Sequence, residues 1–381
     1  MSRPVVAAMV GALALGCAAR PAPRARPAPR LHCRPSQGLS RPLRPCSRSL
    51  PCEGAWVHRD GRPVPRTLRE PAEVPSCRTT APGRAFFDDG APLELVGADG
   101  LARHACVYQP PGASRAQPRP LVVWFHGVYG AAGDLYDHTS LREKATRYDL
   151  SGDPSRPGFT LAAVQARNLH WPGARADGAH LDHYHRDLGH NPDVQMVDQL
   201  VDTLAQTGGV DPRRVYVLGW SNGGVFAEFY ALARHESPTP GGHRVAAGGV
   251  YAAADPFQAP LEAMPAHCAA GSVPRTALPL FLLHRTCDAL SPCGPIQQTY
   301  FRAPPGFDIE AWTRRLGTQL GADVRLQLLD DRAAPATGCA MQCTLPQGQR
   351  NHARWPDGVG DVSGHDWEPA LLDFLRSHPR R

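Results

Sequence analysis

Four continuous apolar runs, with helical patterning between them, constrain the fold of this chain more than any other feature. The runs occupy residues 121–125, 160–164, 215–218 and 280–283. A strand that is buried on both faces reads as a continuous apolar run, because the side chains on each face meet a core. Helical stretches are expected at 194–207, 225–234 and 369–377. Strands that alternate with helices predict an α/β fold, with a mostly parallel central sheet and helices on both faces.

The first 76 residues differ in composition from the rest of the chain. Pro and Arg dominate residues 18–52, in stretches such as RPAPRARPAPR, and residues 53–76 continue in the same style. Such a composition cannot bury an apolar core, so we expect residues 18–76 to form an extended, disordered linker. We predict a single folded domain over 77–381. It is expected to open with an antiparallel pair of strands, 93–96 and 104–108.

Residues 1–17 indicate that the protein is exported. One Arg precedes an apolar run from Val5 to Leu15, which ends at Gly16-Cys17. This is the pattern of a short signal segment. The ending resembles a bacterial lipobox in which Cys17 would be lipidated, with Ala14 where Leu is usual. A lipoprotein anchored to a membrane through Cys17 and a leader cleaved elsewhere both fit, and both place the protein in the periplasm, on the outer membrane or outside the cell.

The positive charge of the chain lies at its front. Residues 1–70 hold 13 of the 41 Lys and Arg residues and 3 of the 35 Asp and Glu residues, so the remainder carries a net charge of −4. An enzyme of nucleic acids is expected to carry positive charge on its folded domain. We therefore expect no nucleic-acid partner.

The cysteines indicate an oxidising compartment. Eleven are present, and removal of Cys17 leaves ten, an even number that fits five disulfides. Spacing alone does not determine connectivity. It suggests three candidate pairs: Cys287 with Cys293, Cys339 with Cys343, and Cys77 with Cys106 across the first hairpin. No CxxC motif is present, so we expect no structural zinc site.

The segment 215–224, VYVLGWSNGG, carries the clearest chemical motif. It places G-x-S-x-G directly after an apolar strand and directly before a helix. In such a turn the Ser hydroxyl projects above the sheet, while Gly219 and Gly223 remove side chains that would clash. We expect Ser221 to be a nucleophile. The alternative is a Gly-rich turn with an incidental Ser.

Backbone amides beside Ser221 would stabilise a developing oxyanion. The helix that begins near Asn222 points its N-terminal amides at this position. The loop 126–130, HGVYG, follows an apolar strand and would supply a second amide, at about Val128. We expect His126 itself to brace the loop.

A carboxylate that orients the catalytic base is expected after the apolar run 280–283. The chain continues there as HRTCD, which places Asp288 in the turn that follows the strand. Such an acid orients the histidine and stabilises its cation. The competing acids are Asp255, Asp330 and Asp331.

Two histidines follow the acid and so keep the order Ser, Asp, His. His352 lies in the segment NHARWP, and His365 lies in GHDW, immediately before the last helix. Periodicity does not choose between them.

The segment 210–224, VDPRRVYVLGWSNGG, resembles the polyhydroxybutyrate depolymerase and feruloyl or acetylxylan esterase group of α/β-hydrolases. Members carry a DPxRVYV stretch, an LHG loop after the first parallel strand, and an H-x-W-P segment that bears the catalytic His. The resemblance favours His352, whose segment HARWP has one residue more than the family pattern. It also implies that residues 343–345 form a strand leading to that histidine. The likeness spans about residues 100–377.

The resemblance implies a serine esterase that needs no cofactor or metal. Ser221, His352 and Asp288 would hydrolyse carboxylic esters through an acyl-enzyme, and the implied substrates are polyhydroxyalkanoates or feruloyl and acetyl esters of polysaccharides. A peptidase or thioesterase of the same fold is an alternative, although about 305 residues leave little room for the cap domain or propeller of many peptidases. A surface lipoprotein that keeps the fold only for binding is another. The oligomeric state is not indicated.

Four His and two Asp residues lie within 180–190, HLDHYHRDLGH. These side chains could bind a metal, but the segment lacks the HExxH pairing of a helical zinc site. We expect a solvated lid or pocket loop without a metal. Trp171 and Tyr184 would either line the pocket or pack.

Overall fold

The computed structural model describes most of the chain after residue 71. The described residues are 72–97, 100–170, 177–183, 188, 191–236, 242–257, 276–294, 297, 308–339, 343–359 and 364–380. The expected signal segment 1–17, the anchor at Cys17 and nearly all of the linker 18–76 lie outside them. These expectations therefore stay predictions.

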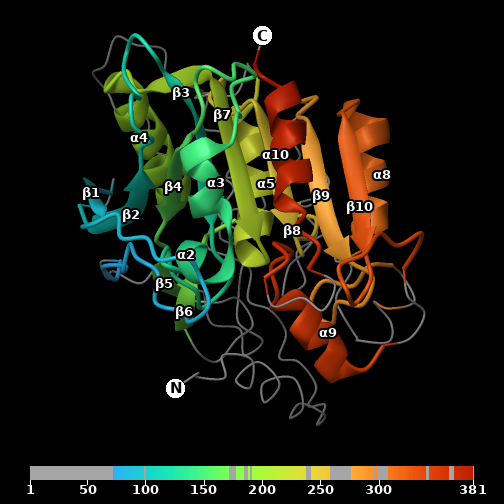
Figure 1. Ribbon diagram of the computed structural model, residues 1–381. Coiled ribbons are helices and arrows are strands. Elements are labelled where there is room, and N and C mark those ends of the chain that lie inside the picture. Colours follow the sequence, from blue (N-terminus) through green and yellow to red (C-terminus); the bar gives the residue numbers. More distant parts are fainter. Residues whose placement is uncertain are drawn as a thin grey trace, which may run out of the picture.

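An eight-stranded sheet runs through the domain (Figure 1). In spatial order its strands are β1 (Leu93–Val96), β2 (Ala102–Tyr108), β4 (Thr160–Val164), β3 (Arg119–Phe125), β7 (Val210–Trp220), β8 (Ala247–Tyr251), β9 (Leu280–Arg285) and β10 (Val324–Leu329). The six strands from β4 to β10 pair in parallel, whereas β2 runs antiparallel to both β1 and β4. This mostly parallel order is the α/β-hydrolase fold, as predicted.

Helices cover both faces of the sheet (Figure 1). One face carries α4 (Pro192–Gln206), α5 (Asn222–Arg234) and α8 (Ile309–Leu320), and the other carries α2 (Asp134–His138), α3 (Leu141–Arg147) and α10 (Glu368–Ser377). Strand β3 contributes to both cores: Val123 packs with the first set of helices and Trp124 with the second. All seven residues of the strand are buried, and after Arg119 and Pro120 it reads as the uninterrupted apolar run 121–125.

A separate hairpin lies beside the loop that follows β3. It consists of β5 (Arg167–His170) and β6 (Asp177–His180), which pair antiparallel. The Tyr129 backbone N–H donates a hydrogen bond to the Ala179 carbonyl at 2.6 Å, which ties the hairpin to that loop. The sequence did not predict this hairpin, because its short polar strands show no apolar run.

Three disulfides lie within the described part of the chain. The expected pair Cys77–Cys106 is present and joins the segment before β1 to β2. The pairs Cys287–Cys293 and Cys339–Cys343 were wrong, because the bonds are Cys287–Cys343 and Cys293–Cys339. Spacing misled here because the fold brings Cys287 and Cys293, in the loop after β9, against Cys343 and Cys339, so that each Cys faces one distant in sequence. Cys268, like the cysteines before residue 72, lies outside the described residues.

The carboxyl ends of the parallel strands meet at one edge of the sheet. His126, Ser221 and Asp288 follow β3, β7 and β9 at this edge, where α/β folds place their ligand sites. Helix α9 (Leu345–His352) lies beyond the same edge in Figure 1. Within the described ranges, every helix is too short or too polar to cross a lipid bilayer.

Candidate active site

Ser221 occupies a strained turn between β7 and α5. Its backbone has φ 56° and ψ −122°, a conformation that residues with a side chain rarely adopt. Two backbone hydrogen bonds hold the turn: the Ser221 N–H donates to the Tyr251 carbonyl at 2.9 Å, and the Val225 N–H donates to the Ser221 carbonyl at 2.9 Å. Strand, turn and helix thus follow one another as the sequence predicted.

Gly219 and Gly223 are required by close backbone contacts around this turn. A Cβ on Gly219 would lie 2.2 Å from the Gly223 carbonyl oxygen. A Cβ on Gly223 would lie 2.3 Å from both the Phe125 and the His126 carbonyl oxygens. Neither approach is sterically possible, so only glycine lets the turn sit this close to β3.

His352 ends helix α9 and faces Ser221. Its Nε2 lies 2.7 Å from the Ser221 Oγ, and its Nδ1 lies 2.9 Å and 3.0 Å from the two carboxylate oxygens of Asp288. The geometry fits an imidazole that carries its proton on Nδ1 and accepts the serine proton at Nε2. The structure therefore brings Ser221, His352 and Asp288 together in one hydrogen-bonded chain.

Asp288 is fully buried in the turn after β9. Its Oδ1 also accepts hydrogen bonds from the backbone N–H groups of Leu290 and Ser291, both at 2.8 Å. His284 supports this turn from below, because its Nε2 lies 2.5 Å from the Ser291 carbonyl. Burial lowers the pKa of His284, so this imidazole is neutral and adds no competing cation beside the acid.

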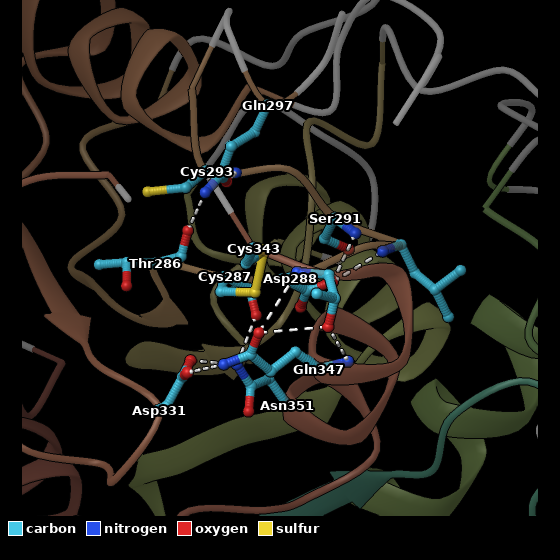
Figure 2. The surroundings of a disulfide bond; sticks show 12 residues. Thr286, Cys287, Asp288, Ser291, Cys293, Gln297, Asp331, Cys343, Gln347 and Asn351 are labelled. Atoms are coloured by element: carbon cyan, nitrogen blue, oxygen red, sulfur yellow. Dashed lines mark hydrogen bonds between the residues drawn. A yellow bond between two sulfur atoms is a disulfide. The ribbon is translucent and has the colours of Figure 1, made fainter. Parts of the chain in front are cut away.

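A disulfide ties the acid's turn to the helix that carries the histidine. Figure 2 shows Cys287, the neighbour of Asp288, bonded to Cys343, which lies just before α9. The Asn351 Nδ2 donates to the Cys287 carbonyl and to the Asp331 carboxylate, each at 2.7 Å (Figure 2). Residues 343–345 are not the strand that the family resemblance implied. Thr344 instead caps α9 by accepting a hydrogen bond from the Gln347 N–H at 3.4 Å.

The backbone around His352 has two further supports that the sequence did not indicate. The Trp220 indole N–H donates to the His352 carbonyl at 2.8 Å. The Tyr251 hydroxyl donates to the Asn351 carbonyl, and Arg285 in turn donates to that hydroxyl at 3.0 Å. Single aromatic residues at strand ends give no sequence signal that would separate this role from packing.

The loop after β3 lies against Ser221. A Cβ on Gly127 would lie 3.5 Å from the Ser221 Cβ, so the glycine leaves the approach to the hydroxyl open. His126 is fully buried; its Nδ1 lies 2.6 Å from the Gly127 carbonyl, and its Nε2 accepts the Ala166 N–H at 3.1 Å. Burial lowers the pKa of His126, which agrees with a neutral ring that holds the loop.

Asn222 begins α5, and its side chain is engaged away from the turn. Its Oδ1 accepts the Leu181 N–H at 2.9 Å, and its Nδ2 donates to the Leu181 carbonyl at 3.2 Å. Its backbone amide and that of half-buried Val128 remain the predicted oxyanion donors.

The competing residues lie elsewhere. His365 is exposed, with its ring centroid 4.7 Å from that of Trp367. Asp255 forms an ion pair with Arg315 at 2.8 Å. The Asp331 carboxylate accepts hydrogen bonds from the side-chain amides of Asn351 and Gln347. Asp330 accepts the backbone N–H groups of its own turn, at Arg332 and Ala334. In the described part of the chain, the carboxylate hydrogen-bonded to His352 is that of Asp288 and not that of any of these three acids.

The segment 180–190 is only partly described, and its described start is not solvated as expected. His180, Asp182 and His183 are all buried, and the Asp182 N–H donates to the Asp193 carboxylate at 2.8 Å. Trp171, Tyr184 and the remaining His residues of this segment lie outside the described residues. Among those that are described, no three His, Cys, Asp or Glu side chains gather as a metal site would require.

Comparisons with known proteins yield a distant likeness. No family model matches the chain, and no curated protein matches it. The Thermogutta terrifontis esterase 2 phosphonylated by cyclosarin is 15% identical over 77% of this chain and 92% of that chain, with a TM-score of 0.45. A thermostable esterase is 16% identical over 77% of this chain and 64% of its own, with a TM-score of 0.41. The fold assignment rests on the strand order of the sheet itself.

Proposed function

We propose that this protein is a serine ester hydrolase that works through an acyl-enzyme. The observation that carries the proposal is the chain of hydrogen bonds from Ser221 through His352 to Asp288, built on a turn whose backbone is strained. A serine hydroxyl within reach of an imidazole, which is oriented in turn by a buried carboxylate, is the arrangement that activates serine as a nucleophile.

Acylation follows from the positions of the protons. His352 takes the proton of Ser221 at Nε2 as the Oγ attacks the ester carbonyl, and Asp288 stabilises the imidazolium through Nδ1. The backbone amides of Asn222 and Val128 would hold the oxyanion of the tetrahedral intermediate. The leaving alcohol then receives the proton from Nε2. Water, activated by the same imidazole, attacks the acyl-enzyme and releases the acid.

The substrate class and the location of the enzyme form part of the proposal. The resemblance of residues 210–224 supports polyhydroxyalkanoates or feruloyl and acetyl polysaccharide esters as substrates. Three disulfides support an oxidising, exported environment. A panel of hydroxybutyrate oligomers, feruloyl sugars and acetylated xylan would rank these substrates, with a thioester and a peptide anilide to test the other hydrolase classes.

Replacement of Ser221 by Ala tests the proposal directly. We expect Ser221→Ala to lower kcat on 4-nitrophenyl butyrate by at least about 10⁴-fold, because the nucleophile is lost. A fluorophosphonate probe should label the wild type and not the variant. Unchanged turnover in Ser221→Ala would refute the nucleophile, and an unlabelled, inactive wild type would favour a protein that keeps the fold only for binding.

The base is tested by two matched variants. His352→Ala should lower kcat on the same ester by at least about 10³-fold, since His352 is the imidazole hydrogen-bonded to Ser221 in the described part of the chain. His365→Ala removes an exposed ring and should leave kcat within about twofold of the wild type. The reverse ranking would move the base to His365.

A further inference from the structure

The two loops that carry the proposed oxyanion donors are both bonded to one short stretch of chain. This stretch, residues 178–182, comprises β6 after its first residue and the two residues that follow, and we call it the bridging segment. It contacts the loop of Val128 at one point and the start of α5 at another. A Cβ on Gly127 would lie 3.5 Å from the Ser221 Cβ, so the loop that the segment holds lies against the proposed nucleophile.

Tyr129 joins this loop to the bridging segment in two ways. Its N–H donates to the Ala179 carbonyl at 2.6 Å. Its ring lies over Gly178, where a Cβ would be only 1.8 Å from the Tyr129 Cε1. The Tyr129 backbone has a φ of 61°, which is uncommon for a residue with a side chain and persists only where the surroundings enforce it. Because Val128 directly precedes Tyr129, the contacts that fix Tyr129 also fix the Val128 amide.

Asn222 joins α5 to the same segment through both polar groups of its side-chain amide. Its Oδ1 accepts the Leu181 N–H at 2.9 Å, and its Nδ2 donates to the Leu181 carbonyl at 3.2 Å. Both residues are buried, so the two hydrogen bonds are shielded from water. An amide supplies a donor and an acceptor together, whereas a carboxylate supplies only acceptors and an aliphatic side chain supplies neither. The Asn222 side chain therefore fixes where α5 begins relative to the bridging segment.

The bridging segment is held firmly at its other end. The Asp182 N–H donates to the Asp193 carboxylate at 2.8 Å, and the Asp182 carbonyl accepts the Asn191 Nδ2 at 2.6 Å. Asp193 also pairs with Arg103, and Asn191 caps α4. All of these residues are buried, so the segment is a fixed reference for the two proposed oxyanion donors.

We propose that the bridging segment sets the spacing of the two oxyanion donors, with the Asn222 side chain as its positioning residue. The inference rests on the proposed hydrolase function. Loss of a whole oxyanion donor lowers kcat by about 10²–10³-fold, so a donor that is kept but displaced should cost part of this, about 10- to 50-fold. The loss should fall on kcat and not on KM, because the amides bind the oxyanion of the transition state more strongly than the neutral carbonyl of the substrate.

Asn222→Ala is the first test, because it keeps the backbone N–H and removes both hydrogen bonds to Leu181. We expect kcat on 4-nitrophenyl butyrate to fall about 10- to 50-fold, with KM within about threefold of the wild type. The second measurement is the inhibition constant Ki of propyl trifluoromethyl ketone, which carries the same propyl chain as the butyryl group. The Ser221 Oγ adds to its carbonyl, the serine proton passes to His352, and the carbonyl oxygen stays as an oxyanion because no group leaves. Ki should rise in proportion to the fall in kcat/KM.

Gly178→Ala reaches the other donor without altering α5. Its methyl group would collide with the Tyr129 ring, which is 40% exposed and can move outward, so the protein should fold while the loop of Val128 shifts. We expect kcat to fall and Ki to rise, as in the first variant, by at least about fivefold each.

Asp308→Ala is the matched control for stability. It removes the cap of α8, where the Asp308 Oδ1 accepts the Ala311 N–H at 2.9 Å, and α8 packs against the edge strand β10. The urea midpoint of unfolding should fall about as much as in Asn222→Ala, because a buried or capping hydrogen bond is lost in each. Both kcat and Ki should stay at the wild-type values.

The outcomes separate this proposal from the hydrolase function. A fall in kcat with an unchanged Ki in Asn222→Ala would overturn the positioning role, because loss of folded protein lowers the rate without weakening the inhibitor. Unchanged kcat in Asn222→Ala and Gly178→Ala, with an active wild type, would also overturn only that role. A wild type that hydrolyses no ester, yet binds the ketone more tightly than Asn222→Ala does, would overturn only the hydrolase function. A wild type that neither hydrolyses esters nor binds the ketone would overturn both.

Discussion

At the scale of single residues, the site depends on how Asp288 and Ser221 are held. The carboxylate of Asp288 is fully buried. It accepts hydrogen bonds from the His352 imidazole and from two backbone N–H groups, so each carboxylate oxygen has a partner. Ser221 gains its exposed hydroxyl through an unfavourable φ of 56°, which the flanking glycines make possible. The proposed chemistry thus relies on one buried carboxylate and one strained turn.

Replacement of Asp288 by Asn is expected to lower kcat by about 10³- to 10⁴-fold with little change in fold. The amide keeps the shape of the carboxylate but favours the wrong tautomer of His352 and no longer stabilises its cation. Kinetics on 4-nitrophenyl butyrate would measure the effect. Asp331→Asn alters the neighbouring carboxylate, which accepts a hydrogen bond from Asn351, and it should lower kcat by less than about tenfold. A larger loss in Asp331→Asn than in Asp288→Asn would contradict the assignment of the acid.

Most of the site residues could be predicted from sequence, because local patterns reveal them. A Gly-rich motif between a strand and a helix locates Ser221, and a short polar turn after a buried strand locates Asp288. Chain order alone left His352 and His365 open. What separates them is that α9 lies over the carboxyl edge of the sheet, held by contacts distant in sequence: Trp220, Tyr251 and a disulfide.

At the scale of elements, the approach of α5 to β3 decides whether the turn can form. Gly223→Ala should lower the free energy of unfolding by at least about 2–3 kcal/mol, because the added Cβ would collide with two backbone carbonyls that cannot move independently. Urea unfolding followed by circular dichroism would measure it. Gly317→Ala is the control: nothing lies within 4 Å of its Cβ position inside α8, so it should stabilise the protein by up to about 1 kcal/mol. Equal effects at the two glycines would show that packing at the turn is looser than described.

The bond between Cys287 and Cys343 is expected to matter for activity as well as stability. The double variant Cys287→Ala/Cys343→Ala should lose about 2–4 kcal/mol of unfolding free energy. It should also lose about 10- to 100-fold in kcat at temperatures where it stays folded, because α9 and the acid's turn would no longer be fixed to each other. The pair Cys77–Cys106 joins β2 to the segment before β1, so its removal should cost stability but less than about twofold in kcat. Equal kcat losses in both double variants would contradict a specific role for the first bond.

The sheet was predictable at this scale, whereas its small additions were not. Continuous apolar runs revealed β3, β4, β7 and β9, because these strands are buried on both faces. The edge strand β10 carries Arg325 and Gln327 between its apolar residues and is fully buried only at Leu328 and Leu329, so it gave no such run. Helix α9 contains Pro, Gly and several polar residues, so its sequence shows no apolar residues at helical spacing. The strand expected at 343–345 was therefore not replaced by a predicted helix.

At the scale of the whole molecule, Glu368 connects parts of the chain that are far apart in sequence. Its carboxylate, at the start of α10, accepts hydrogen bonds from the Ser140 N–H at 3.0 Å, the Trp355 indole at 2.8 Å and the Lys144 ammonium at 2.8 Å. Burial raises the pKa of Glu368 to about 7, while Lys144 acts in the opposite direction. The first helices, the segment after α9 and the last helix therefore share one titrating group.

Stability should fall as the pH rises because of this group. The pKa of Glu368 in the folded state lies above the value of about 4.3 expected in the unfolded chain, so the folded state holds the proton between those pH values. The contribution is present below about pH 4.3 and is lost as the pH rises toward 7. The difference in unfolding free energy between the wild type and Glu368→Gln should therefore decrease by up to about 3 kcal/mol from pH 4 to pH 8. A difference that stays constant across this range, measured by urea unfolding, would contradict the raised pKa.

The two disulfides at the catalytic edge are nested, since Cys287–Cys343 encloses Cys293–Cys339. In an unfolded chain, closing a short loop costs less entropy than closing a long one, so Cys287 meets Cys293 and Cys339 meets Cys343 most often. Oxidation ahead of folding thus traps neighbouring thiols in bonds that keep α9 away from the acid. Only thiol–disulfide exchange can convert them to the native set. Refolding of the reduced chain with an oxidant alone is therefore expected to give a mixture of pairings, and an isomerase or a redox shuffle should raise the yield of the native set.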